Sequence, residues 1–246
     1  MGGQHQTRLE NTQILIGIVS LGGKMPPKWD CNHSHILTKN WGGNQKRQAR
    51  EDTIIGPYRE KYGWSVPHGL QYWTLCGLSV KDGKLVPGCE LDHMVSVGLI
   101  TPDQFYGVEV QKSIYDQNRQ IDGPNWFLNK MNQEVTNHNV DGNFKPAIVN
   151  FDMINYPNNC ATEFSALMLV ISRLKHPVML VGNFVLKAWL HERKDPDFII
   201  DELNKEPQLK EALSIANWEY NQLCYEYRGA DKKSNSIMGT IILHKK

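Results

Sequence analysis

The feature that most constrains the fold of this chain is a short apolar run ending on a carboxylate, which occurs twice. Residues 105–108 are followed by Glu109, and residues 147–151 are followed by Asp152. Short apolar runs bounded by turn signals are typical of strands buried on both faces, as in a parallel sheet. Helical sequence follows each run. The pattern therefore predicts an α/β fold whose strands end on acidic side chains.

The rest of the chain continues this alternation of strands and helices. Further strands are predicted over residues 71–77, 125–128 and 177–186, and helices near residues 90–98, 161–174, 196–204 and 207–218. Two β-rich segments, residues 223–228 and 237–243, enclose a polar loop and predict a closing hairpin. We therefore expect a mostly parallel α/β sheet with a C-terminal antiparallel hairpin. Residues 1–65 are expected to form an N-terminal extension, which contacts the substrate in one interpretation.

Composition excludes several classes of protein. The 246 residues carry a formal net charge of +1, so no global field attracts the chain to nucleic acid or to an acidic membrane. No apolar run is long enough to span a bilayer, and no signal sequence is evident, so we expect no membrane partner. The five cysteines contain no CxxC pair, which favours reduced thiols in the cytoplasm. Cys31, His33 and His35 lack a second ligand pair, so no metal site is predicted.

A local basic cluster contains Lys46, Arg47 and Arg50. Such a run is usually a solvated helix face. The alternative is an arm that contacts phosphates of a nucleic acid. Both interpretations remain open at the level of sequence.

The order of elements resembles that of the class I S-adenosylmethionine-dependent methyltransferases. A strand and glycine turn at Cys76-Gly77 come first, then the strands ending at Glu109 and Asp152, another strand and the closing hairpin. The resemblance covers roughly residues 66–246. It implies a Rossmann-like fold, S-adenosylmethionine as the cofactor and methyl transfer as the activity.

Site residues follow from the resemblance position by position. Cys76 and Gly77 stand at the first, glycine-rich motif, and Glu109 with Val110 stands where an acidic residue binds the ribose hydroxyls. Asn132 stands near the adenine. The fourth motif, which faces the methyl group and the target atom, corresponds to Asp152, Asn155, Tyr156 and Pro157. Stacking of Tyr156 on a planar target favours a nucleic acid as the methyl acceptor.

Two other functions remain open. The loop between Gly77 and Gly88 is long and departs from the close glycine spacing of the family, which favours an inactive Rossmann-like binding module. Asp92-His93 resembles the start of an HNH nuclease site, in which histidine activates water beside a divalent ion. Leu91 and Met94 also fit a helix stripe, which favours a structural role for His93.

Overall fold

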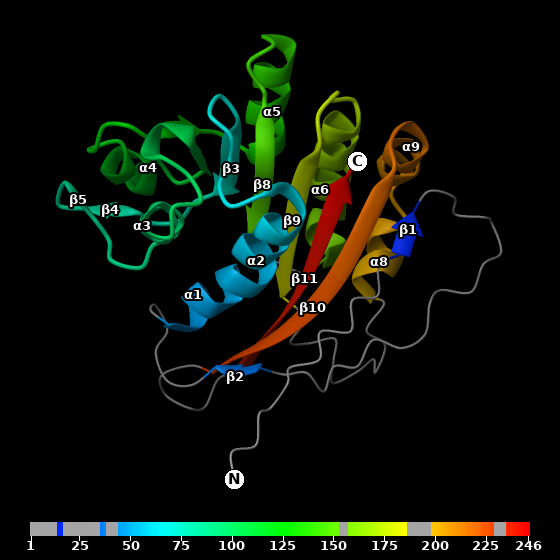
Figure 1. The fold of residues 1–246 in the computed structure, drawn as a ribbon, viewed down its shortest axis with the longest axis horizontal. Helices are drawn as coiled ribbons and strands as arrows, with labels where there is room; N and C mark the ends of the chain where they lie inside the picture. The colour runs from blue at the N-terminus through cyan, green and yellow to red at the C-terminus, as the bar shows by residue number, and fades with distance from the viewer. Residues whose placement is uncertain (1–13, 17–34, 38–43, 153–156, 186–197, 229–234) are drawn as a thin grey trace.

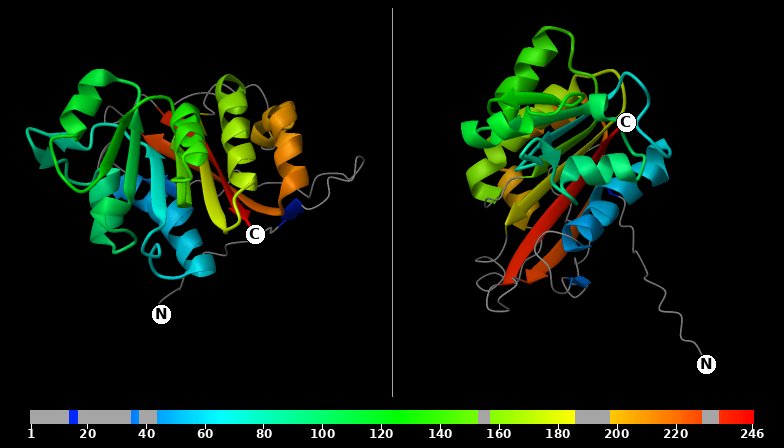
Figure 2. Two further views of the ribbon diagram at one scale, coloured as in Figure 1. Left: turned by 90° about the horizontal axis from the view of Figure 1, so that it is seen from above. Right: turned by 90° about the vertical axis from the view of Figure 1, so that its left-hand side faces the viewer.

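The computed structural model describes residues 14–16, 35–37, 44–152, 157–185, 198–228 and 235–246 (Figure 1). A central sheet holds nine strands, and most helices cover its two faces (Figure 2). The strands of this sheet are β1 (Ile14–Ile16), β2 (His35–Leu37), β3 (Gln71–Leu75), β6 (Phe105–Glu109), β7 (Asn125–Leu128), β8 (Pro146–Asp152), β9 (Val178–Val185), β10 (Trp218–Arg228) and β11 (Asn235–Lys245). A separate small hairpin joins β4 (Val80–Lys81) to β5 (Lys84–Leu85).

Five neighbouring strands run parallel in the order β7-β6-β3-β8-β9. Numbered along the chain, this is the order 3-2-1-4-5 of a doubly wound sheet. The strand order reverses between β3 and β8, because the chain moves outward from β3 to β7 and then returns to the other side. The predicted strands at residues 105–109 and 147–152 are confirmed, and so is the Rossmann-like class of the sheet.

The sheet is completed by the predicted C-terminal hairpin. Strands β10 and β11 pair antiparallel over eleven residues each, from Trp218–Lys245 to Arg228–Asn235. Strand β11 pairs antiparallel with β9, so the last strand lies between β9 and β10. At the outer edge, β10 pairs with β1 antiparallel and with β2 parallel.

Helices form a layer on each face of the sheet (Figure 2). The N-terminal helical segment is continuous and consists of α1 (Asn44–Arg50), the π-helix η1 (Glu51–Ile55) and α2 (Gly56–Tyr62). This segment and α3 (Glu90–Ser96) cover one face of the sheet. The opposite face carries α5 (Met131–Val140), α6 (Pro157–Ser172), α8 (Phe198–Leu203) and α9 (Pro207–Ile215). A 3-10 turn, η2 (Pro102–Gln104), precedes β6, and helix α4 (Lys112–Asn118) follows β6.

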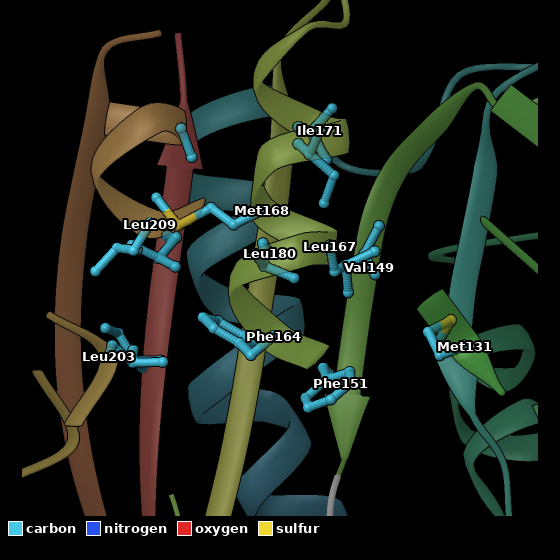
Figure 3. Close-up of a cluster of buried hydrophobic side chains, with 14 of the residues drawn as sticks. Met131, Val149, Phe151, Phe164, Leu167, Met168, Ile171, Leu180, Leu203 and Leu209 are labelled. Carbon is cyan, nitrogen blue, oxygen red and sulfur yellow. The ribbon is translucent and has the colours of Figure 1, made fainter. Parts of the chain in front are cut away.

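Each face of the sheet has its own apolar core. On the α6 face, Phe164, Leu167 and Met168 pack between the strands and α8–α9 (Figure 3). On the other face, Ile54, Ile55 and Tyr58 of the N-terminal helical segment are buried with Tyr72 and Met94. The N-terminal helices thus bury apolar side chains against the same sheet that carries the predicted motifs.

The structure differs from the sequence predictions at several elements. The helix predicted over residues 207–218 ends at Ile215, and Trp218 instead begins β10, where its indole is fully buried and donates to Ser172 Oγ. Apolar content alone does not separate a helix end from a buried strand start. Helix α5 was not predicted, because its sequence is polar and has only two buried residues, Met131 and Val135. No helix within the described ranges is long and apolar enough to cross a membrane.

We predict that Gly107→Ala destabilises the protein, because no side chain fits at this position of β6. An added Cβ would lie 2.6 Å from the Trp126 ring and 2.8 Å from Cys76 Sγ. Overpacking of this kind costs about 1–3 kcal/mol, which corresponds to roughly 2–4 °C in Tm per kcal/mol for a chain of this size. Thermal unfolding followed by circular dichroism measures the change.

Gly77→Ala is the matched control, because a Cβ at Gly77 meets no atom within 4 Å. Its Tm should stay within about 2 °C of the wild type, given that surface changes stay within about 0.5 kcal/mol. Equal Tm values for the two variants would show that the contact of Gly107 with Trp126 is not tight.

Candidate active site

The candidate site lies where the carboxyl ends of β3, β6, β7 and β8 meet. In open α/β sheets, ligands bind outside these ends, at the point where the strand order reverses. Leu75 pairs with Val108, and Thr74 pairs with Asn150. These registers set Cys76 level with Glu109 on one side and with Asp152 on the other. The two acidic residues therefore flank the end of β3, about 10 Å apart at the usual strand spacing.

Glu109 and Asp152 also extend toward the same face of the sheet. Side chains alternate between faces along a strand, and Phe105 and Ile148, each an even number of residues away, both belong to the core beneath α1–α3. The sequence predicted that both strands end on a carboxylate. The pairing of β3 with both strands is what brings the two carboxylates to one place.

The Glu109 carboxylate uses one of its two oxygens in a hydrogen bond within the described chain. Its Oε1 accepts a hydrogen bond of 2.8 Å from the backbone N–H of Gln111, and the side chain is half-buried. Its Oε2 accepts no hydrogen bond from the part of the chain that the structure describes. A fixed carboxylate with an open oxygen can accept hydrogen bonds from the hydroxyl groups of a sugar.

Three large apolar side chains are exposed just beyond the strand ends. Val110 follows β6, Leu78 follows β3, and Leu128 ends β7; they are 60%, 40% and 43% exposed. Leu128 pairs with Glu109 across the β6–β7 ladder, so apolar surface lies next to the carboxylate. Ligand sites combine such apolar surface with a few polar groups that set orientation.

Asp152 ends β8 on the other side of β3. Its side chain is accessible to water, but the surrounding protein and the neighbouring Glu90 carboxylate raise its pKa to about 6, against the weaker opposing effect of Lys46 and Arg50. A carboxyl group of this pKa is largely ionised at neutral pH and accepts a proton more readily than an ordinary aspartate.

A chain of buried hydrogen bonds lies beneath Asp152 on the same face. The Tyr72 hydroxyl donates to Glu90 Oε1 (2.5 Å), and Asn150 Nδ2 donates to the same oxygen (2.9 Å). Asn183 Nδ2 donates to Asn150 Oδ1 (3.1 Å), and Thr240 Oγ1 donates to Asn183 Oδ1 (2.6 Å). Burial and the Glu90 charge raise the pKa of Tyr72, so its phenol stays protonated as a donor. The chain joins β3, β8, β9, β11 and α3 below the candidate site.

Sequence reasoning missed this chain, although one signal was present. Asn150 and Asn183 each interrupt an otherwise apolar strand. Since a buried amide needs hydrogen-bond partners, an asparagine within such a run indicates a polar network.

The loop after β3 differs from a glycine-rich phosphate turn. Asn118, the fully buried last residue of α4, donates from Nδ2 to Gly77 O (3.0 Å) and accepts at Oδ1 from the N–H groups of Ser79 and Val80 (2.8 and 3.0 Å). The loop is thereby held against α4 before it enters the β4–β5 hairpin. Gly77 is exposed, whereas the Cys76 thiol is buried and burial raises its pKa. Gly77 is thus open to a ligand, but Cys76 offers only its backbone.

The other predicted residues lie in different places. Pro157 is buried at the start of α6, and Asn155 and Tyr156 lie outside the described residues. Asn132 lies in the first turn of α5 and lines a cavity of about 340 Å³ that also contains Val170 and Gln208. That helix packs on the α6 face, so the structure does not bring Asn132 to the face toward which Glu109 and Asp152 extend.

The basic cluster lies on α1, close to the strand ends. Arg47 Nη2 is 3.5 Å from Asp92 Oδ2, and Arg50 Nη1 donates to Gly88 O (3.0 Å). Lys46 and Arg47 are exposed, whereas Arg50 is half-buried. Arg47 therefore contacts α3, and Arg50 contacts the loop that leads into it.

Asp92 and His93 lie on α3 as the helix stripe predicted. Asp92 Oδ2 accepts from Gly88 N–H (2.7 Å), and the buried His93 places Nε2 3.2 Å from Glu51 Oε1. Among the residues that the structure describes, no group of three His, Cys, Asp or Glu side chains could hold a metal ion. The nuclease hypothesis thus gains no metal site in this region.

Comparisons with known proteins add little. No protein-family model matches the chain, and no curated protein matches it. The chain is similar in structure to SMU.776, described as "a putative methyltransferase complexed with SAH", with a TM-score of 0.43 and 9% sequence identity. The match covers 80% of this chain and 48% of that one, so the chain spans about half the length of that protein.

We predict that Asp152 makes stability fall as pH rises from about 4 to about 6. The unfolded carboxyl group loses its proton near pH 4, whereas the folded one keeps it to about pH 6. The folded state therefore binds more protons in this window, and the free energy of unfolding decreases with pH. Asp152→Asn removes the effect, so the Tm of the variant relative to wild type should be higher at pH 7 than at pH 4.

Asp116→Asn is the control for this measurement, because the Asp116 side chain is 46% exposed and pairs with Lys112 on α4. An Asp152→Asn offset in Tm that is the same at both pH values would contradict the shifted pKa.

Proposed function

We propose that this protein is an S-adenosylmethionine-dependent methyltransferase. The observation that carries the proposal is the arrangement at the switch point, where Glu109, exposed apolar side chains and Asp152 surround the carboxyl end of β3 on one sheet. The antiparallel hairpin of β10 and β11 that closes the sheet also supports it, because the order of elements in class I methyltransferases ends with such a hairpin.

The residues present fit such a cofactor. The open oxygen of Glu109 would accept hydrogen bonds from the ribose hydroxyls, and Val110 with Leu128 would pack against the adenine. When bound, S-adenosylmethionine supplies a methyl group activated by its sulfonium. The site would mainly position the donor and the acceptor in line, since alignment is the principal demand of a displacement.

Asp152 would act on the acceptor. If the acceptor is an amine, its nitrogen forms the new bond to the methyl carbon, the carbon–sulfur bond breaks, and the nitrogen must lose a proton. Asp152 would accept a hydrogen bond from the amine and then take that proton. Its raised pKa suits this role at neutral pH.

A nucleic acid is the acceptor that we propose. Lys46 and Arg47 are exposed on α1 beside the strand ends, where they would contact phosphates next to the site. A base presented to Asp152 would have to leave its stack, as in other enzymes that modify bases.

A second candidate is a binding module without turnover. The specific observation in its favour is the loop after β3, which Asn118 holds in place and which contains no close series of glycines. Such a module would bind the cofactor or a related nucleoside without transferring a methyl group.

We expect calorimetric titration to show saturable binding of S-adenosylmethionine and S-adenosylhomocysteine. Glu109→Gln should weaken both by about ten- to a hundredfold, because it removes charge-assisted hydrogen bonds to the ribose. Glu211→Gln on α9, where the carboxylate is exposed and pairs with Arg173, is the matched control and should bind as wild type does. Unchanged affinity in folded Glu109→Gln would remove this residue from the site.

Transfer of a labelled methyl group to nucleic acid tests the activity and the acceptor together. Asp152→Asn should reduce the initial rate at least about tenfold while S-adenosylhomocysteine affinity changes little, because a general base contributes to the reaction rather than to cofactor binding. Binding without transfer to DNA, RNA or protein would favour the binding module. Transfer of the labelled methyl group to protein alone would show that the acceptor is a protein and not a nucleic acid.

A further inference from the structure

The N-terminal helical segment docks on α3 and on the loop that precedes it through three polar contacts. Arg47 reaches Asp92, Arg50 donates to Gly88 O, and Glu51 lies against His93. The contacting residues on the α3 side, 88–93, follow the loop after β3 and border the candidate site. The helical segment therefore supplies side chains to the cofactor end of the protein and does more than cover the sheet.

Arg50 is the cation of α1 that is partly buried. Burial raises the pKa values of Tyr72, Cys89 and Asp152, which come from β3, the loop before α3 and β8, and the charge of Arg50 partly opposes this rise in each. A guanidinium has five N–H donors. Within the described ranges, one hydrogen bond of Arg50 is made, to Gly88 O. Donors thus remain for a ligand beside Asp152.

A π-turn sets the rotation of this part of the helix. Gly56 N–H donates to Glu51 O, and a Cβ at Gly56 would lie 2.9 Å from that oxygen. The extra residue in the turn changes the phase between α1 and α2, so that Ile54, Ile55 and Tyr58 all remain buried in the core while Arg50 lies over the strand ends. Such turns inside α-helices occur frequently at functional sites.

The geometry of the site determines which part of the cofactor comes near Arg50. With the ribose at Glu109 on β6, the remainder of the molecule must cross the end of β3 to bring its sulfur near Asp152 on β8. The methionine chain continues beyond the sulfur and ends in a carboxylate. In this orientation that end would lie on the side of the site where α1 and the loop before α3 meet.

We propose that Arg50 binds the α-carboxylate of the methionine part of S-adenosylmethionine, an inference that rests on the proposed function. The planar guanidinium matches a carboxylate with two parallel hydrogen bonds. Lys46, one turn earlier and close enough to act on Asp152, adds positive charge on the same side. Arg50 is thus a cofactor-binding residue.

The test compares two ligands that differ at the amino-acid end. S-adenosylhomocysteine carries the carboxylate, whereas 5′-methylthioadenosine has the same nucleoside and thioether sulfur without it. Calorimetry on the full chain should show that Arg50→Gln weakens the binding of S-adenosylhomocysteine at least about tenfold. The affinity for 5′-methylthioadenosine should change by less than about twofold. Arg50→Lys should recover part of the lost affinity, since it restores the positive charge without the two parallel hydrogen bonds of a guanidinium.

Arg173→Gln is the matched control, because it removes an exposed guanidinium that pairs with Glu211 on the opposite helix layer. It should bind both ligands as wild type does. The 5′-methylthioadenosine titration also shows that Arg50→Gln is folded.

Each remaining outcome overturns the proposal. Equal losses for the two ligands would mean that Arg50 only ties α1 to Gly88, and no loss for either would place the carboxylate elsewhere. If the wild type binds 5′-methylthioadenosine but not S-adenosylhomocysteine, the site takes nucleosides without an amino-acid end. If it binds neither, the proposed function itself fails.

Discussion

The buried carboxylate of Glu90 is the contact on which the candidate site depends. It is the first residue of α3, and it accepts from Tyr72 on β3 and Asn150 on β8, the two strands between which the sheet order reverses. One side chain thus joins the first helix after β3 to both sides of the switch point. A buried charge with charge-assisted hydrogen bonds is stable only while its donors stay in place. The positions of β3, β8 and α3 are therefore coupled, and the Glu90 charge adds to the rise in the pKa of Asp152 that burial causes.

Much of the sheet could be predicted from sequence because its strands are buried on both faces. Short apolar runs closed by Glu109 and Asp152 predicted β6 and β8, and the hairpin signal predicted β10 and β11. Sequence could not show the contacts that depend on residues distant in the chain. Asn118 holds the loop after Gly77 from 41 positions away, and no local pattern indicates such a bond. The asparagines within β8 and β9 were a usable signal that their apolar neighbours obscured.

The basic cluster shows why two interpretations of a charge run are too few. The sequence allowed a solvated face or a phosphate-binding arm for Lys46, Arg47 and Arg50. In the structure all three cations lie on α1, but their surroundings differ: Lys46 and Arg47 are exposed, whereas Arg50 is half-buried and contacts the loop before α3. Neighbours in sequence thereby acquire different surroundings. Spacing alone could not predict this division, because the contact that distinguishes Arg50 is with Gly88, 38 positions away in the chain.

The insertion of β11 between β9 and β10 has a consequence for how the chain folds during synthesis. Strand β10 leaves the ribosome first, but its place in the sheet is defined by β11, which follows it. Until residues 235–245 emerge, β9 remains an open edge and β10 has no neighbour on its inner side. Exposed strand edges in such intermediates promote association between chains. Pairing of β11 with β9 and β10 is therefore the step that covers the open strand edges of the nascent sheet.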